Sequence, residues 1–220
     1  MKYPLFTSLA GAAAIGGCAS TTTIDDYRPT TEPIEIGTGE KVAILGRSDA
    51  GHYETDRSFI DCLGDKLKNA DFQVVPEQEF VDALYPWFEP RTAPKHLSRL
   101  NKLMQDPVIQ EKVQQERIRY LVWLDGEEET HGRTCSMACG MTAAGGGCYG
   151  YQSRDRNEMF EAVVWDMSDL TEKARIRVDS EGTSYLIGVV APIPLLTRVK
   201  SQACEGMGEQ LRGYFSSEVG

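Results

Sequence analysis

Short apolar runs alternate with stretches of helical periodicity along most of the chain. The runs predict strands, and they cover residues 41–47, 71–76, 119–127 and 159–167. Over residues 172–182, apolar and basic residues alternate one by one, which is typical of an antiparallel strand with one solvated face. Five strands are therefore expected.

Between most of these strands, apolar residues recur every three or four positions, which predicts amphipathic helices. The first helix is expected to begin near Thr55 or Asp56, because both residues suit an N-cap. Pro76 and Pro107 suit a first helical turn and so predict the starts of further helices. The last helix is expected over about residues 195–215.

The order of these elements is β-α-β-α-α-β-β-β-α. Strands that alternate with helices and then form a meander predict an α/β fold, in which helices pack on a mixed sheet. A chain of 220 residues is long enough for one domain with a substantial core, and that domain is expected over residues 41–220.

The amino terminus has the pattern of an export signal. One cation, Lys2, precedes an apolar and small-residue run over residues 5–15 that is too short to span a bilayer. The run ends in "IGGC" (15–18), which resembles the bacterial lipobox. That resemblance implies removal of residues 1–17 and lipidation of Cys18. The alternative is a plain signal peptide with an incidental cysteine.

Lipidation would hold the protein on a membrane, since each buried CH₂ contributes about 0.8 kcal/mol and several acyl chains act together. Ala19 is not the aspartate of an inner-membrane retention signal, so the resemblance implies the periplasmic face of the outer membrane. Residues 18–40 are rich in Thr, Pro and acids without periodicity. This composition predicts a flexible tether behind the lipidated Cys18.

The chain is acidic, with 33 Asp and Glu against 23 Lys and Arg and a formal net charge of −10. This balance argues against nucleic acid as a partner, because nucleic-acid sites are basic. The histidines His52, His96 and His131 belong to no catalytic pattern, and the sequence has neither G-x-S-x-G nor a P-loop. We therefore expect no enzyme activity and no cofactor.

Five cysteines follow Cys18, and an oxidising compartment favours disulfides between them. Cys62 and Cys204 lie in the first and last expected helices, each among apolar residues. A Cys62–Cys204 bridge and two buried thiols are the alternatives for this pair. Because five is odd, one thiol should stay free or pair between chains.

Residues 131–156 are rich in glycine and cysteine and are expected as a long loop between two strands. One interpretation is a hairpin extension stapled by a disulfide from Cys148 to Cys139 or Cys135, with Cys135 as the free thiol in the main version. A second is a metal site that uses these three cysteines and His131, although the spacing lacks the C-x₂-C pairs of common zinc sites. A third is a flexible loop with reactive thiols.

A proline-rich stretch, "PWFEPRTAP" (86–94), carries candidate binding residues. Trp87 and Phe88 are large aromatic side chains of the kind that anchor protein partners, and Arg91 lies beside them. The competing interpretation is that both aromatic residues pack over a helix end.

The order of the pieces resembles a known family. "KVAILG", "DFQVV", "YLVWLDGE" and "AVVWDMSDLTEKARIRVDSEG" are followed by a terminal helix, over about residues 41–215. This order is similar to that of the bacterial lipoproteins of the curli-export and penicillin-binding-protein-activator superfamily, whose domain is similar to the amino-terminal domain of the Tol-system β-propeller protein. "DMSDLTE" lacks the turn glycine of that family's pattern. The resemblance implies an adaptor or assembly role in the envelope, without catalytic residues.

These features together predict an outer-membrane lipoprotein whose periplasmic domain acts as a non-catalytic interaction module. Its partners would be the membrane, through the lipid, and an envelope protein such as a secretion channel or a cell-wall synthase. Self-assembly into a homo-oligomer is a further option. The competing class is a metal- or redox-active envelope protein, or a hydrolase, that uses the His/Cys loop at residues 131–148.

Overall fold

The structure is a computed structural model. It describes residues 20–29, 34–49, 52–53, 55–68, 72–89, 92–142, 145–188, 192–195 and 199–215. Within these ranges, the side chains of residues 48–53, 128–154 and 184–195 are not described.

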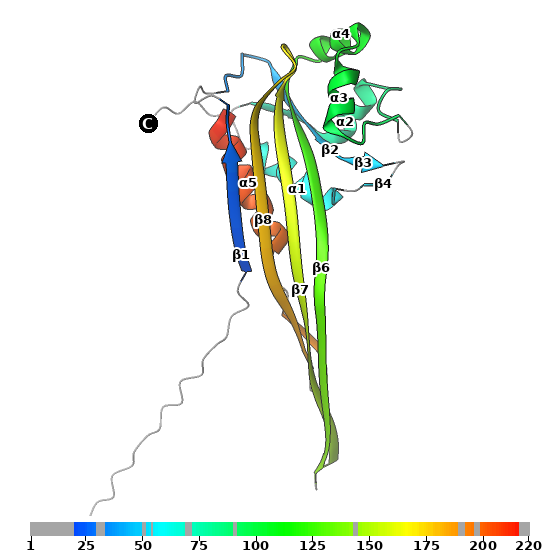
Figure 1. The fold of residues 1–220 in the computed structure, drawn as a ribbon, viewed down its shortest axis with the longest axis vertical. Helices are drawn as coiled ribbons and strands as arrows, with labels where there is room; N and C mark the ends of the chain where they lie inside the picture. Colours follow the sequence, from blue (N-terminus) through cyan, green and yellow to red (C-terminus); the bar gives the residue numbers. More distant parts are fainter. Residues whose placement is uncertain are drawn as a thin grey trace, which may run out of the picture.

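A mixed sheet organises the described residues, as the sequence predicts, but it has seven strands where five are expected, because β1 and β9 join it (Figure 1). The strand order is β1-β8-β7-β6-β2-β5, and β9 pairs with β8. Strand β2 is parallel to β5 and β6, and the other pairs are antiparallel. The strands are β1 (Ser20–Tyr27), β2 (Lys41–Gly46), β5 (Gln73–Val75), β6 (Ile118–Thr142), β7 (Gly145–Asp166), β8 (Thr171–Gly188) and β9 (Pro192–Leu195). Strands β3 (Ser48–Asp49) and β4 (His52–Tyr53) form a separate two-stranded ladder.

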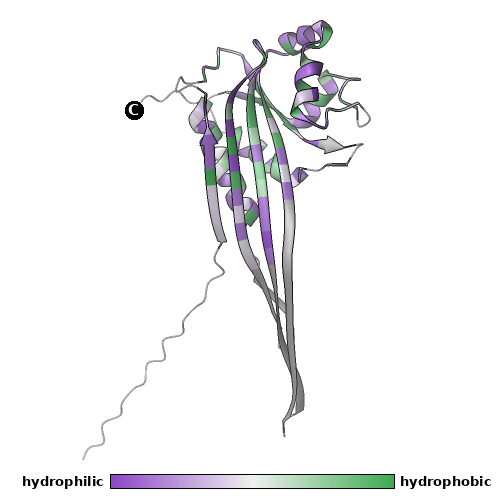
Figure 2. Ribbon diagram, in the orientation of Figure 1, coloured by the Kyte–Doolittle hydropathy of each residue, from purple (hydrophilic) through white to green (hydrophobic). Residues whose placement is uncertain are grey.

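Helices cover both faces of the sheet. They are α1 (Arg57–Leu67), α2 (Glu77–Ala83), α3 (Leu97–Met104), α4 (Pro107–Gln115) and α5 (Val199–Phe215). Helices α1 and α5 share one hydrophobic core with the sheet, and α2, α3 and α4 share a second core on the opposite face (Figure 2). Strand β2 contributes alternately to the two cores, which explains its unbroken apolar sequence.

The expected helix starts follow from their caps. Asp56 is the N-cap of α1, where its carboxylate accepts from the backbone N–H groups of Ser58 and Phe59. Asp106 caps α4 in the same way, and Pro107 occupies the first turn. Both caps satisfy backbone donors that a helix leaves without partners.

The expected flexible tether over residues 18–40 is wrong for its described part. Residues 20–27 form β1, which pairs with β8 from Ser20↔Gly182 to Tyr27↔Arg175. The hydroxyl of Tyr214 donates to Asp26 over 3.0 Å. Ile34 is buried, and its N–H donates to the carbonyl of Tyr214 over 3.3 Å. The polar composition favours a tether in the sequence because β1 is an edge strand and buries few side chains. Backbone hydrogen bonds to β8 hold this strand in the sheet.

The expected loop over residues 131–156 is also wrong, because this segment is β-strand on both sides of residues 143–144. Strands β6 and β7 pair continuously from Tyr120↔Asp166 to Thr142↔Gly145, with one irregularity between His131 and Arg133. Glycine weakens a strand but does not exclude one. Here the continuous pairing of β6 with β7 outweighs the low strand propensity of the glycines. The hairpin-extension interpretation agrees with this backbone.

The long hairpin gives the molecule its elongated shape. At about 3.3 Å per residue, the 25 residues of β6 extend over roughly 80 Å. We define the arm as residues 131–142, 145–155, 183–188 and 192–195, the parts of β6, β7, β8 and β9 that run past the helices (Figure 1).

Candidate functional site

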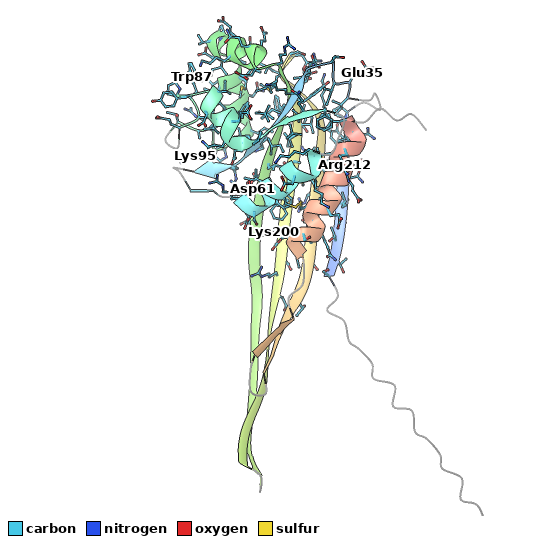
Figure 3. The ribbon with its side chains drawn as sticks, turned by 180° about the vertical axis from the view of Figure 1, so that it is seen from behind. Glu35, Asp61, Trp87, Lys95, Lys200 and Arg212 are labelled. Atoms are coloured by element: carbon cyan, nitrogen blue, oxygen red, sulfur yellow. A yellow bond between two sulfur atoms is a disulfide. The ribbon has the colours of Figure 1, made fainter. Side chains whose placement is uncertain are left out.

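A disulfide joins the first and last helices. Cys62 on α1 and Cys204 on α5 are bonded, with their Cα atoms 6.4 Å apart. Of the two alternatives left by the sequence, a bridge or two buried thiols, the structure contains the bridge. The two helices lie against the same face of the sheet (Figure 3). The bond therefore ties the first and last helices together within one core.

Ion pairs reinforce the same helix pair. The ammonium of Lys200, at the start of α5, contacts the carboxylate of Asp56, the N-cap of α1. Lys66 on α1 reaches Glu205 on α5 over 3.2 Å. Burial raises the pKa of Asp56, but hydrogen bonds from Lys200 and Ser58 and the charge of Lys200 outweigh it, and the pKa falls from 3.8 to about 2.

This pKa predicts an acid-sensitive contribution to stability. A carboxyl group whose pKa is lowered by folding contributes stability above its unfolded pKa, and that contribution disappears as the pH falls toward the folded pKa. We expect wild type to lose stability relative to Asp56→Asn between about pH 4 and pH 2. Asparagine is the matched control, because it keeps the N-cap and removes the charge. Urea unfolding across this pH range measures the difference, and parallel curves for the two proteins would contradict the prediction.

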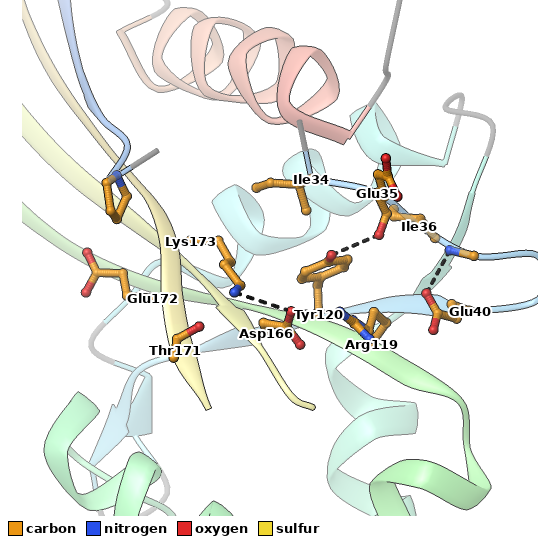
Figure 4. Close-up of a pocket in the computed structure, with 12 residues that line it drawn as sticks. Ile34, Glu35, Ile36, Glu40, Arg119, Tyr120, Asp166, Thr171, Glu172 and Lys173 are labelled. Carbon is orange, nitrogen blue, oxygen red and sulfur yellow. Dashed lines mark hydrogen bonds and ion pairs between the residues drawn. The ribbon is translucent and has the colours of Figure 1, made fainter. Parts of the chain in front are cut away.

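A cleft of about 790 Å³ lies where β6, β7 and β8 meet the segment before β2 (Figure 4). At its centre is the buried carboxylate of Asp166, at the end of β7. The guanidinium of Arg119 on β6 donates to it over 2.9 Å, and the ammonium of Lys173 on β8 lies 3.7 Å away. The backbone N–H and the hydroxyl of Ser168 also donate to Asp166, over 2.9 and 2.7 Å.

The charges of this cleft stabilise one another. Burial lowers the pKa of Arg119, but the charge of Asp166, acting together with Tyr120 and Glu40, outweighs it, and the pKa is raised. A hydrogen bond to Asp169 raises the pKa of Lys173. Nearby, the hydroxyl of Tyr120 donates to the carbonyl of Glu35 over 2.8 Å. The cluster thus clamps the ends of three strands together and orders the segment that leads into β2.

The cleft supports a structural role better than a catalytic one. Its two cations are already paired with Asp166 and Asp169. Among the lining residues, none forms the nucleophile and general-base pair that covalent catalysis requires. Among the side chains that the structure describes, no group of three His, Cys, Asp or Glu is placed to hold a metal ion.

The predicted aromatic binding residues are only partly available. Phe88 is buried in the second core, with its ring 5.3 Å from that of Phe80, so its interpretation as an exposed anchor is wrong. Trp87 is half-buried against the same core, and the ammonium of Lys112 lies 5.7 Å from its ring. The packing interpretation therefore prevails for this pair. Arg91 lies outside the described residues.

For the cysteines of the arm, the structure describes the backbone. Cys139 is the direct cross-strand partner of Cys148, whereas Cys135 is opposite Gln152. His131 is opposite Asp155. The register therefore separates Cys135 from Cys148 by four positions along the ladder, or about 13 Å.

Asp166 and its partners are absent from the candidates chosen from the sequence. A signal for them exists in "DMSDLT" (166–171), where an aspartate twice precedes a serine or threonine by two positions. Both carboxylates accept from the N–H and the hydroxyl of that residue, Ser168 or Thr171. This pattern is that of Asx turns, so the sequence could reveal the turn but not its distant partner, Arg119.

Cys18, the predicted lipidation site, lies outside the described residues. No helix in the described ranges has the length and apolar character needed to cross a membrane.

Comparison with protein-family models and with curated proteins finds no match. Several solved structures are similar in fold at low identity. The PelC dodecamer from Paraburkholderia phytofirmans is 12% identical with a TM-score of 0.39, and the match covers 90% of this chain and 100% of that one. Lipoprotein GNA1162 from Neisseria meningitidis is 10% identical with a TM-score of 0.35, covering 79% of this chain and 99% of that one.

A neuraminyllactose-binding hemagglutinin homolog from Helicobacter pylori is 8% identical with a TM-score of 0.38, and the match covers 87% of this chain and 94% of that one. The words lipoprotein, dodecamer and hemagglutinin describe those proteins. Because the identities and TM-scores are low, we draw nothing about function from these likenesses.

Proposed function

We propose that the chain is an outer-membrane lipoprotein, anchored through Cys18, whose periplasmic domain serves as a non-catalytic assembly module of the cell envelope. The Cys62–Cys204 disulfide supports the location, because such bonds persist in oxidising compartments. The "IGGC" sequence supports the anchor. Residues 1–17 would be the signal peptide, and the domain would begin at β1 rather than after a tether.

The observation that carries the assembly role is the open outer edge of β6. Strand β2 pairs with β6 only along residues 118–124. From Asp125 to Thr142, no strand in the described part of the chain pairs with the edge of β6 opposite β7. An unpaired edge of this length is a template for another strand. We therefore propose self-assembly or pairing with an envelope protein along this edge, in line with the resemblance to the curli-export and penicillin-binding-protein-activator superfamily.

Metabolic labelling with palmitate tests the anchor. Wild type is expected to incorporate label and to fractionate with the outer membrane, whereas Cys18→Ala is expected to do neither. Equal labelling of both proteins would exclude lipidation at Cys18. Light scattering of the detergent-solubilised protein, together with crosslinking in intact cells, then identifies whether the partner at the β6 edge is a second copy or another protein.

Two cysteines of the arm, Cys139 and Cys148, lie opposite each other in the sheet. We propose a Cys139–Cys148 disulfide, because the two residues are opposed in the register and cross-strand neighbours lie at the Cα distance that a disulfide needs. Cys135 is then the odd thiol. Peptide mapping without reducing agent and metal analysis test this pairing. Stoichiometric zinc with free thiols would instead support the metal- or redox-active alternative.

A further inference from the structure

The disulfide of the two helices passes over several other cysteines. It joins the second of the six cysteines, Cys62, to the last one, Cys204, across a separation of 142 residues. The cysteines between them in the sequence are Cys135, Cys139 and Cys148. The native bond is therefore non-consecutive, because the next thiol along the chain after Cys62 is not its partner.

Encounters in the unfolded chain favour the wrong partners of Cys62. The probability that two residues of a flexible chain meet falls with about the 3/2 power of their separation. Cys135 is only about half as far from Cys62 along the chain as Cys204 is. Weighting all four possible partners in this way, we expect Cys204 to be the first partner in about one encounter in eight. Before the chain folds, the native pair is the least favoured one.

The order in which the chain is made adds to this preference. Segments near the amino terminus become available first, so Cys62 and Cys135 can react before Cys204 is present. The core that aligns Cys62 with Cys204 includes α5, the last helix. The packing that would select the correct partner is thus complete only when the end of the chain has arrived.

The folded protein excludes the competing pairs. The hydroxyl of Thr55 donates to the carbonyl of Leu124 over 3.0 Å, which places the start of α1 beside β6. Cys62 is seven residues from Thr55, mostly along α1, and so at most about 15 Å away. Cys135 is eleven residues beyond Leu124 on the extended β6, about 35 Å away. The Cα atoms of Cys62 and Cys135 are therefore farther apart than the roughly 7 Å that a disulfide allows, and the other two arm cysteines lie still farther along the hairpin (Figure 1).

The native bond is protected once it has formed. Cys204 is 0% exposed, and Cys62 packs half-buried against the same core. The ion pair of Lys66 with Glu205 holds the two helices together next to the bond (Figure 3). Thiol–disulfide exchange requires access to the sulfur atoms. An attacking thiolate can therefore reach a misplaced bond in a chain that has not folded, whereas the native bond is shielded.

We propose that this chain is a substrate of a disulfide isomerase in the compartment where it folds, an inference that rests on the proposed export. A disulfide-carrying oxidase first oxidises two thiols of the chain, such as those of Cys62 and Cys135, and is itself reduced to the dithiol. The resulting Cys62–Cys135 bond prevents α1 and β6 from reaching their native positions, because the fold holds these two residues apart.

The isomerase corrects this bond by two exchanges. Its thiolate attacks the sulfur of Cys62, forms a mixed disulfide and releases the thiolate of Cys135. The thiolate of Cys204 then attacks the sulfur of Cys62, which forms the native bond and returns the isomerase thiolate. The two exchanges together consume no oxidant or reductant. They leave Cys135 as a thiol, in agreement with its proposed place as the odd cysteine.

Bond mapping in a bacterial host with or without its periplasmic disulfide isomerase tests this step. The full-length protein is expressed in both strains, which keep the oxidase, and free thiols are alkylated in acid-quenched cells before peptide mapping without reducing agent. Without the isomerase, we expect the fraction of chains with the Cys62–Cys204 bond to fall by roughly threefold or more, and the Cys62–Cys135 bond to appear. An equal fraction of native bond in the two strains would overturn the proposal.

The matched control lacks the competing thiols. The triple variant Cys135→Ala, Cys139→Ala and Cys148→Ala leaves Cys62 with Cys204 as its one partner after residue 18, so its bond should form equally in both strains. A loss of native bond as large as that of wild type would show that the isomerase does not act on pairing, and would overturn the proposal. If the triple variant does not accumulate, Cys135→Ala alone replaces it, and its dependence on the isomerase should be smaller than that of wild type. Equal dependence would overturn the proposal in the same way.

The same strains separate this inference from the proposed export. Native bonding that does not depend on the isomerase overturns the inference and leaves the export intact. If Cys62 and Cys204 stay reduced in both strains, the chain does not reach an oxidising compartment, and both proposals fall.

Discussion

Replacing Cys62 and Cys204 together with alanine is expected to lower the free energy of unfolding by about 4 kcal/mol. The bond closes a loop of 142 residues, and the chain-entropy model gives the largest stabilisation to long loops, at roughly 4–5 kcal/mol. For a domain of this size, that loss lowers the midpoint of thermal unfolding by about 10 °C or more. Calorimetry of the wild type and of the double variant measures the shift.

Reduced wild type is the matched control for this experiment. In reducing agent, wild type and the double variant both lack this bond and the proposed Cys139–Cys148 bond, so the two proteins should then have nearly the same stability. Cys135→Ala should leave the midpoint nearly unchanged if Cys135 is the odd thiol. An unchanged midpoint in both reduced wild type and the double variant would show that the bond does not constrain the unfolded chain.

Asp166→Asn is expected to destabilise the protein by about 3 kcal/mol, because it leaves Arg119 without its buried counter-charge and removes one of the two carboxylates beside Lys173, which keeps Asp169. Because each of these two cations is 33% exposed, we expect a loss of stability at the lower end of the values known for buried ion pairs. The same change weakens the turn that Ser168 makes with the carboxylate. Chemical unfolding at neutral pH measures the loss.

Asp179→Asn provides the matched comparison. Asp179 also accepts from an arginine, Arg177, over 3.0 Å, but this pair is exposed on the open face of the sheet. Its removal is expected to change stability by less than about 0.5 kcal/mol. Equal effects of the two substitutions would mean that Asp166 does not clamp the strand ends.

The local features of the fold could be read from the sequence because they depend on neighbours in the chain. Asp56 and the pair Asp106-Pro107 cap their helices as expected. Cys204, with the apolar residues one helical turn away from it, lies on the buried side of the last helix as expected. Periodicity also gave the α/β class, since strand and helix periods differ.

Features that depend on distant pairing were missed. The polar composition of residues 20–27 predicts a tether. In the folded protein these residues pair with β8, which is distant in the sequence. The local propensity of the glycine- and cysteine-rich segment, residues 131–156, predicts a loop. The described residues of this segment instead form parts of β6 and β7, which stabilise each other by pairing. Arg119 and Asp166 are 47 residues apart, so no local pattern connects them.

The intact mass of the native protein, purified from membranes without reducing agent, tests the account most directly. We predict a chain that begins at Cys18, carries acyl groups and has the Cys62–Cys204 bond closed. A chain that retains Met1, carries no lipid and reacts with thiol reagents at Cys62 and Cys204 would contradict it.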